Sequence, residues 1–152
     1  MIAHQRTFMS ALTLLGVLNT SCDRDFGTPI GPAGGTVVSE DGRFKLKVPA
    51  GALDESIGVS VHAVDEGPSG ALRAYAIEPM GTVLSPPATV QFDWSSLEGF
   101  NGREFEGASM RGPMLVVARG AQWQQMADQV ADADAQHVAA SANDFSVVAV
   151  VK

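Results

Sequence analysis

Arg43-Phe-Lys-Leu-Lys-Val48 decides the class of fold, because its apolar and charged side chains alternate without a break. Successive side chains of a β-strand point to opposite faces, so the three apolar side chains share one face and the two lysines share the other. One buried and one solvated face are typical of an antiparallel sheet. Thr36-Val-Val-Ser39 comes before it, and Glu40-Asp-Gly42 supplies the turn between them. These segments predict a β-hairpin.

The same alternation continues to the end of the chain. Further strands are predicted at residues 57–63, 75–77, 90–94, 114–118, 123–126, 136–140 and 145–151. Eight or nine short strands separated by turn residues predict an all-β, antiparallel β-sandwich. Trp94 and Trp123 alternate with other inward residues, so both are expected to be buried. Residues 97–112 are rich in Gly and charge and are expected to form a surface loop.

Two segments need a separate interpretation. Residues 127–140 are rich in Ala, but their apolar residues follow no helical spacing, so a loop and a strand are expected there. Residues 145–151 are apolar on both faces apart from Ser146. A strand of this composition at an exposed edge would promote aggregation, so it is predicted to lie in the centre of a sheet.

The only cysteine, Cys22, follows a segment that looks like a secretory leader. Residues 1–6 are weakly basic, Phe8–Leu18 is a short apolar run, and Asn19-Thr-Ser21 leads to the thiol. A basic start, an apolar segment and small residues before a cleavage site define a signal peptide. With Cys as the first residue after the cut, the arrangement resembles a bacterial lipoprotein leader, which implies that Cys22 carries lipid such as palmitate.

This interpretation divides the chain into a lipoprotein-type signal peptide (1–21), a tether (22–32) and one domain (33–152). The usual lipoprotein pattern has Leu three places before Cys, whereas this chain has Asn19 there and Leu18 one step earlier. Ordinary secretion with cleavage near Ser21 is one alternative. An uncleaved apolar anchor is another, although the apolar run is about half the length that a membrane-spanning helix needs.

The charge of the chain restricts its partners. The formal net charge is −7, and removal of the leader takes away Arg6 but none of the 17 acidic residues, which lowers it to −8. An acidic surface without a basic cluster repels phosphate backbones, so no nucleic-acid partner is expected. Contact with the membrane is therefore expected through the lipid and not through the protein surface. A single Cys also excludes an internal disulfide.

Three parts of the chain resemble the ZU5-type domain, an immunoglobulin-like β-sandwich, in the form found in bacterial surface lipoproteins. They are Ile30–Val38 with Asp41-Gly42 and Leu46–Leu53, Tyr75–Gly81 with Pro86–Phe92, and Trp123 with Phe145-Ser146. Val48-Pro-Ala-Gly-Ala-Leu53 is the most specific of these motifs. Its residues have structural roles, because Pro49 has no N–H to continue a ladder and Gly51 can adopt positive φ in a sharp turn.

The resemblance implies one possible reaction. Some eukaryotic relatives of the ZU5 domain cut themselves between Phe and Ser, with the Ser hydroxyl attacking the preceding carbonyl and a His acting as base. The matching bond here is Phe145–Ser146, and the histidines that remain after processing are His62 and His137. This chemistry requires the base to lie within hydrogen-bond reach of the hydroxyl. Phe145 as core residue and Ser146 as strand residue is the plainer interpretation.

Calcium binding is the other alternative. Asp128, Asp132 and Asp134 lie close together in a predicted loop, and Ca²⁺ prefers oxygen ligands. Their spacing differs from that of an EF-hand, and acidic loops are commonly just solvated. No transition-metal site, cofactor or Gly-x-Ser-x-Gly nucleophile motif is indicated.

The sequence thus predicts a non-enzymatic, lipid-anchored binding or structural module at the bacterial cell envelope, on the periplasmic face or at the cell surface. A protein partner, unidentified by the sequence, would bind the loops at one end of the sandwich. The alternatives are a self-processing module and a calcium-stabilised adhesion domain.

Overall fold

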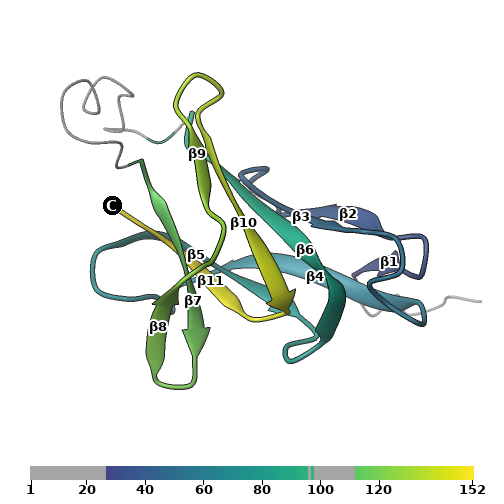
Figure 1. Ribbon diagram of the computed structural model, residues 1–152. Helices are drawn as coiled ribbons and strands as arrows, with labels where there is room; N and C mark the ends of the chain where they lie inside the picture. Colours follow the sequence, from purple (N-terminus) through teal and green to yellow (C-terminus); the bar gives the residue numbers. More distant parts are fainter. Residues whose placement is uncertain (1–26, 96, 98–111) are drawn as a thin grey trace, which may run out of the picture.

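The computed structural model describes residues 27–95, 97 and 112–152. These residues form an all-β fold of two antiparallel sheets, which confirms the predicted class (Figure 1). The predicted signal peptide, Cys22 and all of the predicted loop 97–112 except its two end residues lie outside the described residues.

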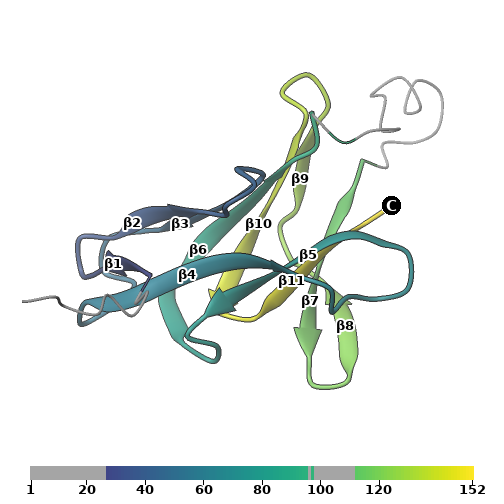
Figure 2. The ribbon, with the colours of Figure 1, turned by 180° about the vertical axis from the view of Figure 1, so that it is seen from behind.

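Within the described ranges, eleven strands make up the two sheets. The six-stranded sheet has the order β1-β4-β5-β11-β7-β8, and the five-stranded sheet has the order β2-β3-β6-β10-β9. The strands are β1 (Thr28–Ile30), β2 (Gly35–Val38), β3 (Phe44–Val48), β4 (Ile57–Val64), β5 (Ala71–Glu78), β6 (Val83–Asp93), β7 (Met114–Arg119), β8 (Gln122–Gln125), β9 (Val130–Asp132), β10 (His137–Asp144) and β11 (Val147–Val151). Strands β1 to β3 lie on the opposite side of the molecule from β7 to β9 (Figures 1 and 2).

The count of strands exceeds the predicted eight or nine because two three-residue strands, β1 and β9, were not anticipated. Strand β1 also corrects the boundary of the domain, since Thr28–Ile30 pairs with β4 inside the predicted tether. A proline is tolerated in an edge strand, so Pro29 does not prevent this pairing. Ile30 is buried in the core, so the sandwich includes Thr28–Ile30 and is not confined to residues 33–152.

The core lies between the two sheets and is built by the predicted alternation. In β3 the side chains of Phe44, Leu46 and Val48 are buried and the two lysines are exposed. Trp94 is buried as predicted. Trp123 differs, because it lies directly opposite Ala118 on the outer face of edge strand β8 and remains partly exposed. The side-chain period of two determines which residues share a face, but not whether a second layer covers that face.

Strand β11 lies between β5 and β7, so the apolar C-terminal segment is central in its sheet, as its composition predicted. Residues 127–140 contain turns, β9 and the start of β10, and no helix, which also matches the expectation. The Val48–Leu53 element ends β3 as predicted. Gly51 has φ +80° and donates its N–H to the carbonyl of Pro32, while Leu53 is buried at the end of the core.

The sequence suggested a strand that begins after Pro86 and Pro87, at residues 90–94. Strand β6 instead begins at Val83 and passes through both prolines. The register of β10 explains this difference. Ala142 pairs with Ala88 but Asp144 pairs with Val83, so β6 bulges between these two partners. Prolines are accepted at bulges, where no ladder hydrogen bond is required of them.

Candidate functional site

The segment between β10 and β11 carries the candidate site. Phe145 is completely buried. Its N–H donates to the carbonyl of Thr82 (2.9 Å), and its carbonyl oxygen accepts a hydrogen bond from the N–H of Gly81 (2.8 Å). Residues 81 and 82, in the corner between β5 and β6, therefore bind both the N–H and the carbonyl group of Phe145.

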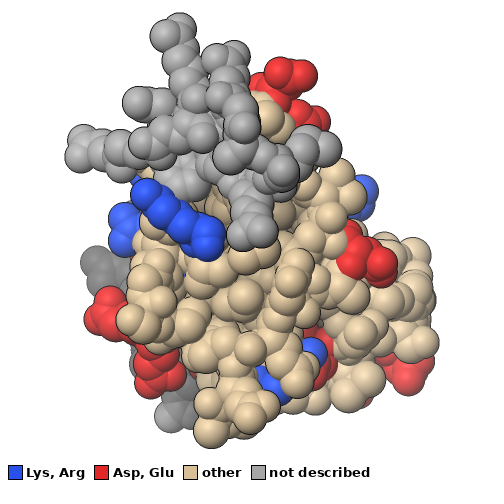
Figure 3. Space-filling model, turned by 60° about the vertical axis from the view of Figure 1, so that its left-hand side comes forward, with Lys and Arg blue, Asp and Glu red and all other residues tan. Residues whose placement is uncertain are grey.

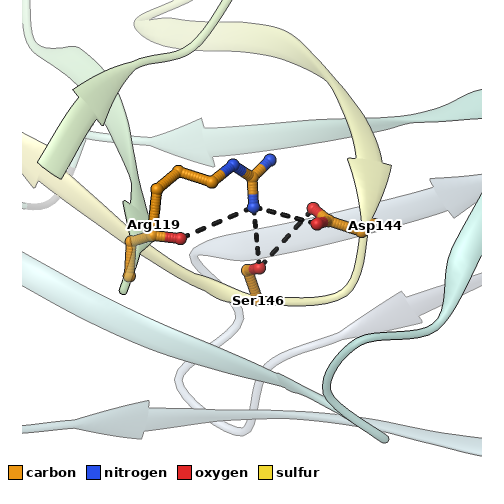
Figure 4. A network of polar contacts seen from close by, with 4 residues as sticks. Arg119, Asp144 and Ser146 are labelled. Atoms are coloured by element: carbon orange, nitrogen blue, oxygen red, sulfur yellow. Dashed lines mark hydrogen bonds and ion pairs between the residues drawn. The ribbon is translucent and has the colours of Figure 1, made fainter. Parts of the chain in front are cut away.

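A polar network surrounds Ser146 on the other side of this segment (Figure 4). Arg119 Nη1 donates to Asp144 Oδ2 at 2.9 Å and to Ser146 Oγ at 3.1 Å. The Ser146 hydroxyl also lies 3.5 Å from Asp144 Oδ1. The side chains of Arg119 and Asp144 are 36% and 30% exposed, so solvent reaches the ion pair. Arg119, from the end of β7, thus bridges the end of β10 and the start of β11.

The chemistry of this network is limited by the groups in contact. A guanidinium has donors and no acceptor, so Arg119 cannot remove the proton of Ser146. Asp144 is the nearest group that could accept it, and its other carboxylate oxygen is engaged by Arg119. The arrangement orients the hydroxyl and neutralises the carboxylate, which are structural effects as much as chemical ones.

His137 does not join the site. It is the first residue of β10, directly opposite Asp93 of β6, whereas Asp144 is the last residue of β10. At the rise of an extended strand these two ends of β10 are roughly 23 Å apart. An unbroken strand therefore separates His137 from the Phe145–Ser146 bond, against the sequence-based alternative.

His62 also lies away from the hydroxyl. It belongs to β4, and β5 lies between β4 and β11. Its ring nitrogen is 4.0 Å from a carboxylate oxygen of Glu78. Ser146 instead contacts Arg119, on the opposite side of β11. Neither histidine is placed as the general base that self-cleavage was expected to use.

The three aspartates proposed for calcium do not converge. Within the part of the chain that the structure describes, no group of three or more His, Cys, Asp or Glu side chains could hold a metal ion. Asp132 instead accepts the N–H of Ala135 at 2.8 Å, which closes the turn between β9 and β10. Asp128 adopts φ +52° in the connection between β8 and β9. These residues serve the turns of the sandwich.

Sequence reasoning identified Phe145 and Ser146, but it gave Asp144 no role in a site and missed Arg119. The sequence carries no local signal for this residue, because it lies 27 positions before Ser146 and meets it only through the pairing of β7 with β11. A basic residue at the end of a strand that neighbours a central strand is recognisable only once strand order is known.

Charged side chains lie mostly around the rim of the face that Figure 3 shows, and neutral side chains occupy its centre. On the outer side of the six-stranded sheet, neutral residues occur at aligned positions of neighbouring strands: Val147 lies beside Ala76 in β5, and Ala149 lies between Ala74 and Val116.

A scan against protein-family models finds no match for the chain, and a search of curated proteins finds none either. Among the described residues there is no helix that is long and apolar enough to cross a membrane.

Proposed function

We propose that this chain is a non-enzymatic, lipid-anchored module that binds a protein partner, or spaces one from the membrane, at the bacterial cell envelope. The resemblance to ZU5-type domains of bacterial surface lipoproteins supports this role, and the observed two-sheet sandwich is compatible with it. Loops and strand edges of a rigid sandwich are suitable contact surfaces.

The observation that carries the proposal is the position of Cys22 relative to the first strand. The lone thiol ends a leader-like segment, and β1 begins at Thr28, only six positions later. Six residues span at most about 20 Å even when fully extended. A lipid on Cys22 would therefore hold the β1 side of the sandwich close to the membrane surface.

Mass spectrometry of the protein purified from its native membrane tests the anchor. The expected product begins at Cys22 and carries the mass of a diacylglyceryl group. A Cys22→Ser variant should lose that mass and leave the detergent-rich phase, while Thr20→Ser, which keeps a small residue before the cut, should behave as wild type. An unmodified mature chain that begins at another residue would contradict the proposal.

Self-processing at Phe145–Ser146 is a second candidate, and one contact favours it. The N–H of Gly81 donates to the Phe145 carbonyl oxygen at 2.8 Å, where negative charge would develop if the Ser146 hydroxyl attacked. The attack would form an ester, break the Phe145–Ser146 amide and free the Ser146 amine, after which water would cleave the ester. Asp144 would have to accept the hydroxyl proton.

Intact-mass measurement decides between the two functions. Self-processing predicts a separate peptide of Ser146–Lys152, seven residues long, which disappears in Ser146→Ala and in Asp144→Asn but persists in His137→Ala. An uncut chain in wild type and in all three variants would exclude it. No contact in the described residues favours the calcium-stabilised adhesion domain over these two.

A further inference from the structure

Among the described residues, no strand pairs with one edge of β4 over much of its length. It runs for eight residues, Ile57–Val64, but β1 pairs only with Ile57–Val59. Residues Ser60–Val64 pair with β5 on one side. On the other side, no strand among the described residues covers them. An uncovered edge presents backbone N–H and C=O groups to any extended chain that can align with it.

Two open hollows flank this edge, one toward each face of the sheet. The inner hollow, about 540 Å³, lies between β4 and edge strand β2 and includes Val37, Val38, Val59 and Val61. The outer hollow, about 480 Å³, is formed by both polar and apolar residues, among them Val64, Ala76, Met80 and Val147. His62 and Glu78 line both hollows.

This pair of hollows matches the geometry of an added strand. Side chains of a strand paired with β4 would point alternately toward the inner and the outer hollow. Main-chain hydrogen bonds then give affinity, and alternate side chains give specificity. Ala63 is exposed although it shares the phase of the buried Val59 and Val61, and it lines the outer hollow, so this end of the edge is open to solvent.

The charge around the edge is negative. Glu40 and Glu78 line the inner hollow, and Asp65, Glu66 and Glu78 line the outer one. Among the described residues, no Lys or Arg lines either hollow. A second copy of this chain, added edge to edge, would bring these carboxylates together, which like-charge repulsion opposes. The charge instead favours a basic occupant.

We infer that the Ser60–Val64 edge of β4 accepts an extended segment of a partner protein in which apolar residues alternate with Lys or Arg. The apolar side chains would contact the valines of the inner hollow, and the basic ones would lie near Asp65, Glu66 and Glu78. This inference rests on the proposed binding role and is independent of the lipid anchor.

A synthetic peptide of four Lys-Val repeats, with both ends blocked, is the probe. Added to the mature protein, it should slow amide exchange at least tenfold at those amides of Ser60–Val64 that point away from β5, and the exchange of the β8 and β9 edges should not change. A Glu-Val peptide of the same length should bind at least tenfold more weakly. Methylating the backbone nitrogens of either the Lys or the Val residues removes one hydrogen-bonding edge, so one of these two peptides should lose binding.

Glu66→Lys should lower the affinity for the Lys-Val peptide at least threefold. Asp134→Lys is the matched control, because Asp134 is exposed in the turn between β9 and β10 and should have no effect. The inference would be overturned if Glu66→Lys left the affinity for the Lys-Val peptide unchanged, or if both methylated peptides bound as well as the unmethylated one. Protection of amides elsewhere in the protein, and not at this edge, would also overturn it.

Two further outcomes would also overturn it. If amides 60–64 are protected without peptide in a concentration-dependent dimer, the occupant is a second copy. If they are protected in the monomer and deletion of residues 23–26 removes the protection, the occupant is the chain itself. Any of these failures, with diacylglyceryl still found on Cys22, would leave the proposed envelope role intact.

Discussion

Tyr75 Oη donates a hydrogen bond to Asp41 Oδ2 at 2.7 Å, and this contact joins the two sheets of the sandwich. Tyr75 belongs to β5 of the six-stranded sheet, and Asp41 lies in the turn between β2 and β3 of the other. Ser39 Oγ and the N–H of Arg43 also donate to this carboxylate. The buried Tyr75 ring stacks on Phe44 with 4.8 Å between centroids. The turn is thereby attached to the opposite sheet by a charge-assisted bond.

Replacement of Tyr75 by Phe should lower the free energy of unfolding by about 1–2 kcal/mol, because it removes one hydrogen bond to a charged group and keeps the ring. Chemical denaturation measures the loss. Asp41→Asn and the double variant complete a double-mutant cycle, and a coupling energy near zero would mean that the contact does not stabilise the fold.

Acid should destabilise the protein partly through Asp41. Burial raises the pKa of this carboxyl, but hydrogen bonds from Ser39, Tyr75 and the Arg43 amide outweigh it, so the pKa lies below its ordinary value. The unfolded chain therefore binds this proton more readily. The stabilisation is present above the unfolded pKa, near 3.9, and is lost as pH falls through the folded pKa.

Urea unfolding at a series of pH values below 5 checks this expectation. Wild type should lose more stability over that range than Asp41→Asn, which has no carboxyl to protonate. Parallel curves for the two proteins would show that Asp41 does not contribute to the acid sensitivity.

Gly34 and Gly51 provide a matched pair of substitutions. Both have positive φ, +74° and +80°, but a Cβ on Gly34 would overlap the Val48 carbonyl oxygen, whereas nothing lies within 4 Å of one on Gly51. Gly51→Ala should cost about 1–2 kcal/mol from conformation alone. Gly34→Ala should cost about 1–3 kcal/mol more, because the backbone must also shift. Equal losses in thermal or urea unfolding would refute the steric argument.

Phe145 and Ser146 should differ sharply in their effect on stability. Phe145→Ala leaves a cavity in the core and should cost about 3–5 kcal/mol. Ser146→Ala removes only a partly exposed hydroxyl beside an ion pair, so its effect should stay within about 1 kcal/mol. Denaturation midpoints of the two variants test this contrast, and a larger effect at Ser146 would require a role that the observed contacts do not explain.

Calcium should not stabilise the sandwich. Since the structure does not bring Asp128, Asp132 and Asp134 together as a metal site, the melting temperature should be the same in excess calcium and in chelator. The Asp132→Asn variant serves as control, because it can still accept the Ala135 N–H through its amide oxygen. A rise in melting temperature with calcium that Asp132→Asn abolishes would contradict the expectation.

Most of the strands could be predicted from the sequence because a half-buried strand has a local pattern, the alternation of apolar and polar residues. The alternation in residues 43–48 identified the buried face of β3, and the two-sided apolar segment near the C-terminus identified a central strand. It missed β1 and β9, which have three residues each, because so short a strand carries no periodicity. It misplaced Trp123 because the side-chain pattern is the same in a covered and an uncovered sheet face.

What the sequence determined alone is the class of fold and the faces of its strands, since a period of two depends only on neighbouring residues. The order of the strands was decided by the tertiary structure, because pairing joins residues far apart in the chain. That order brought Arg119 to Ser146, placed both histidines away from it and joined Tyr75 to Asp41. It also left the Ser60–Val64 edge of β4 without a neighbouring strand in the part of the chain that the structure describes. Each candidate site on this protein therefore depends on which strands pair, and a pattern of neighbouring residues does not predict that pairing.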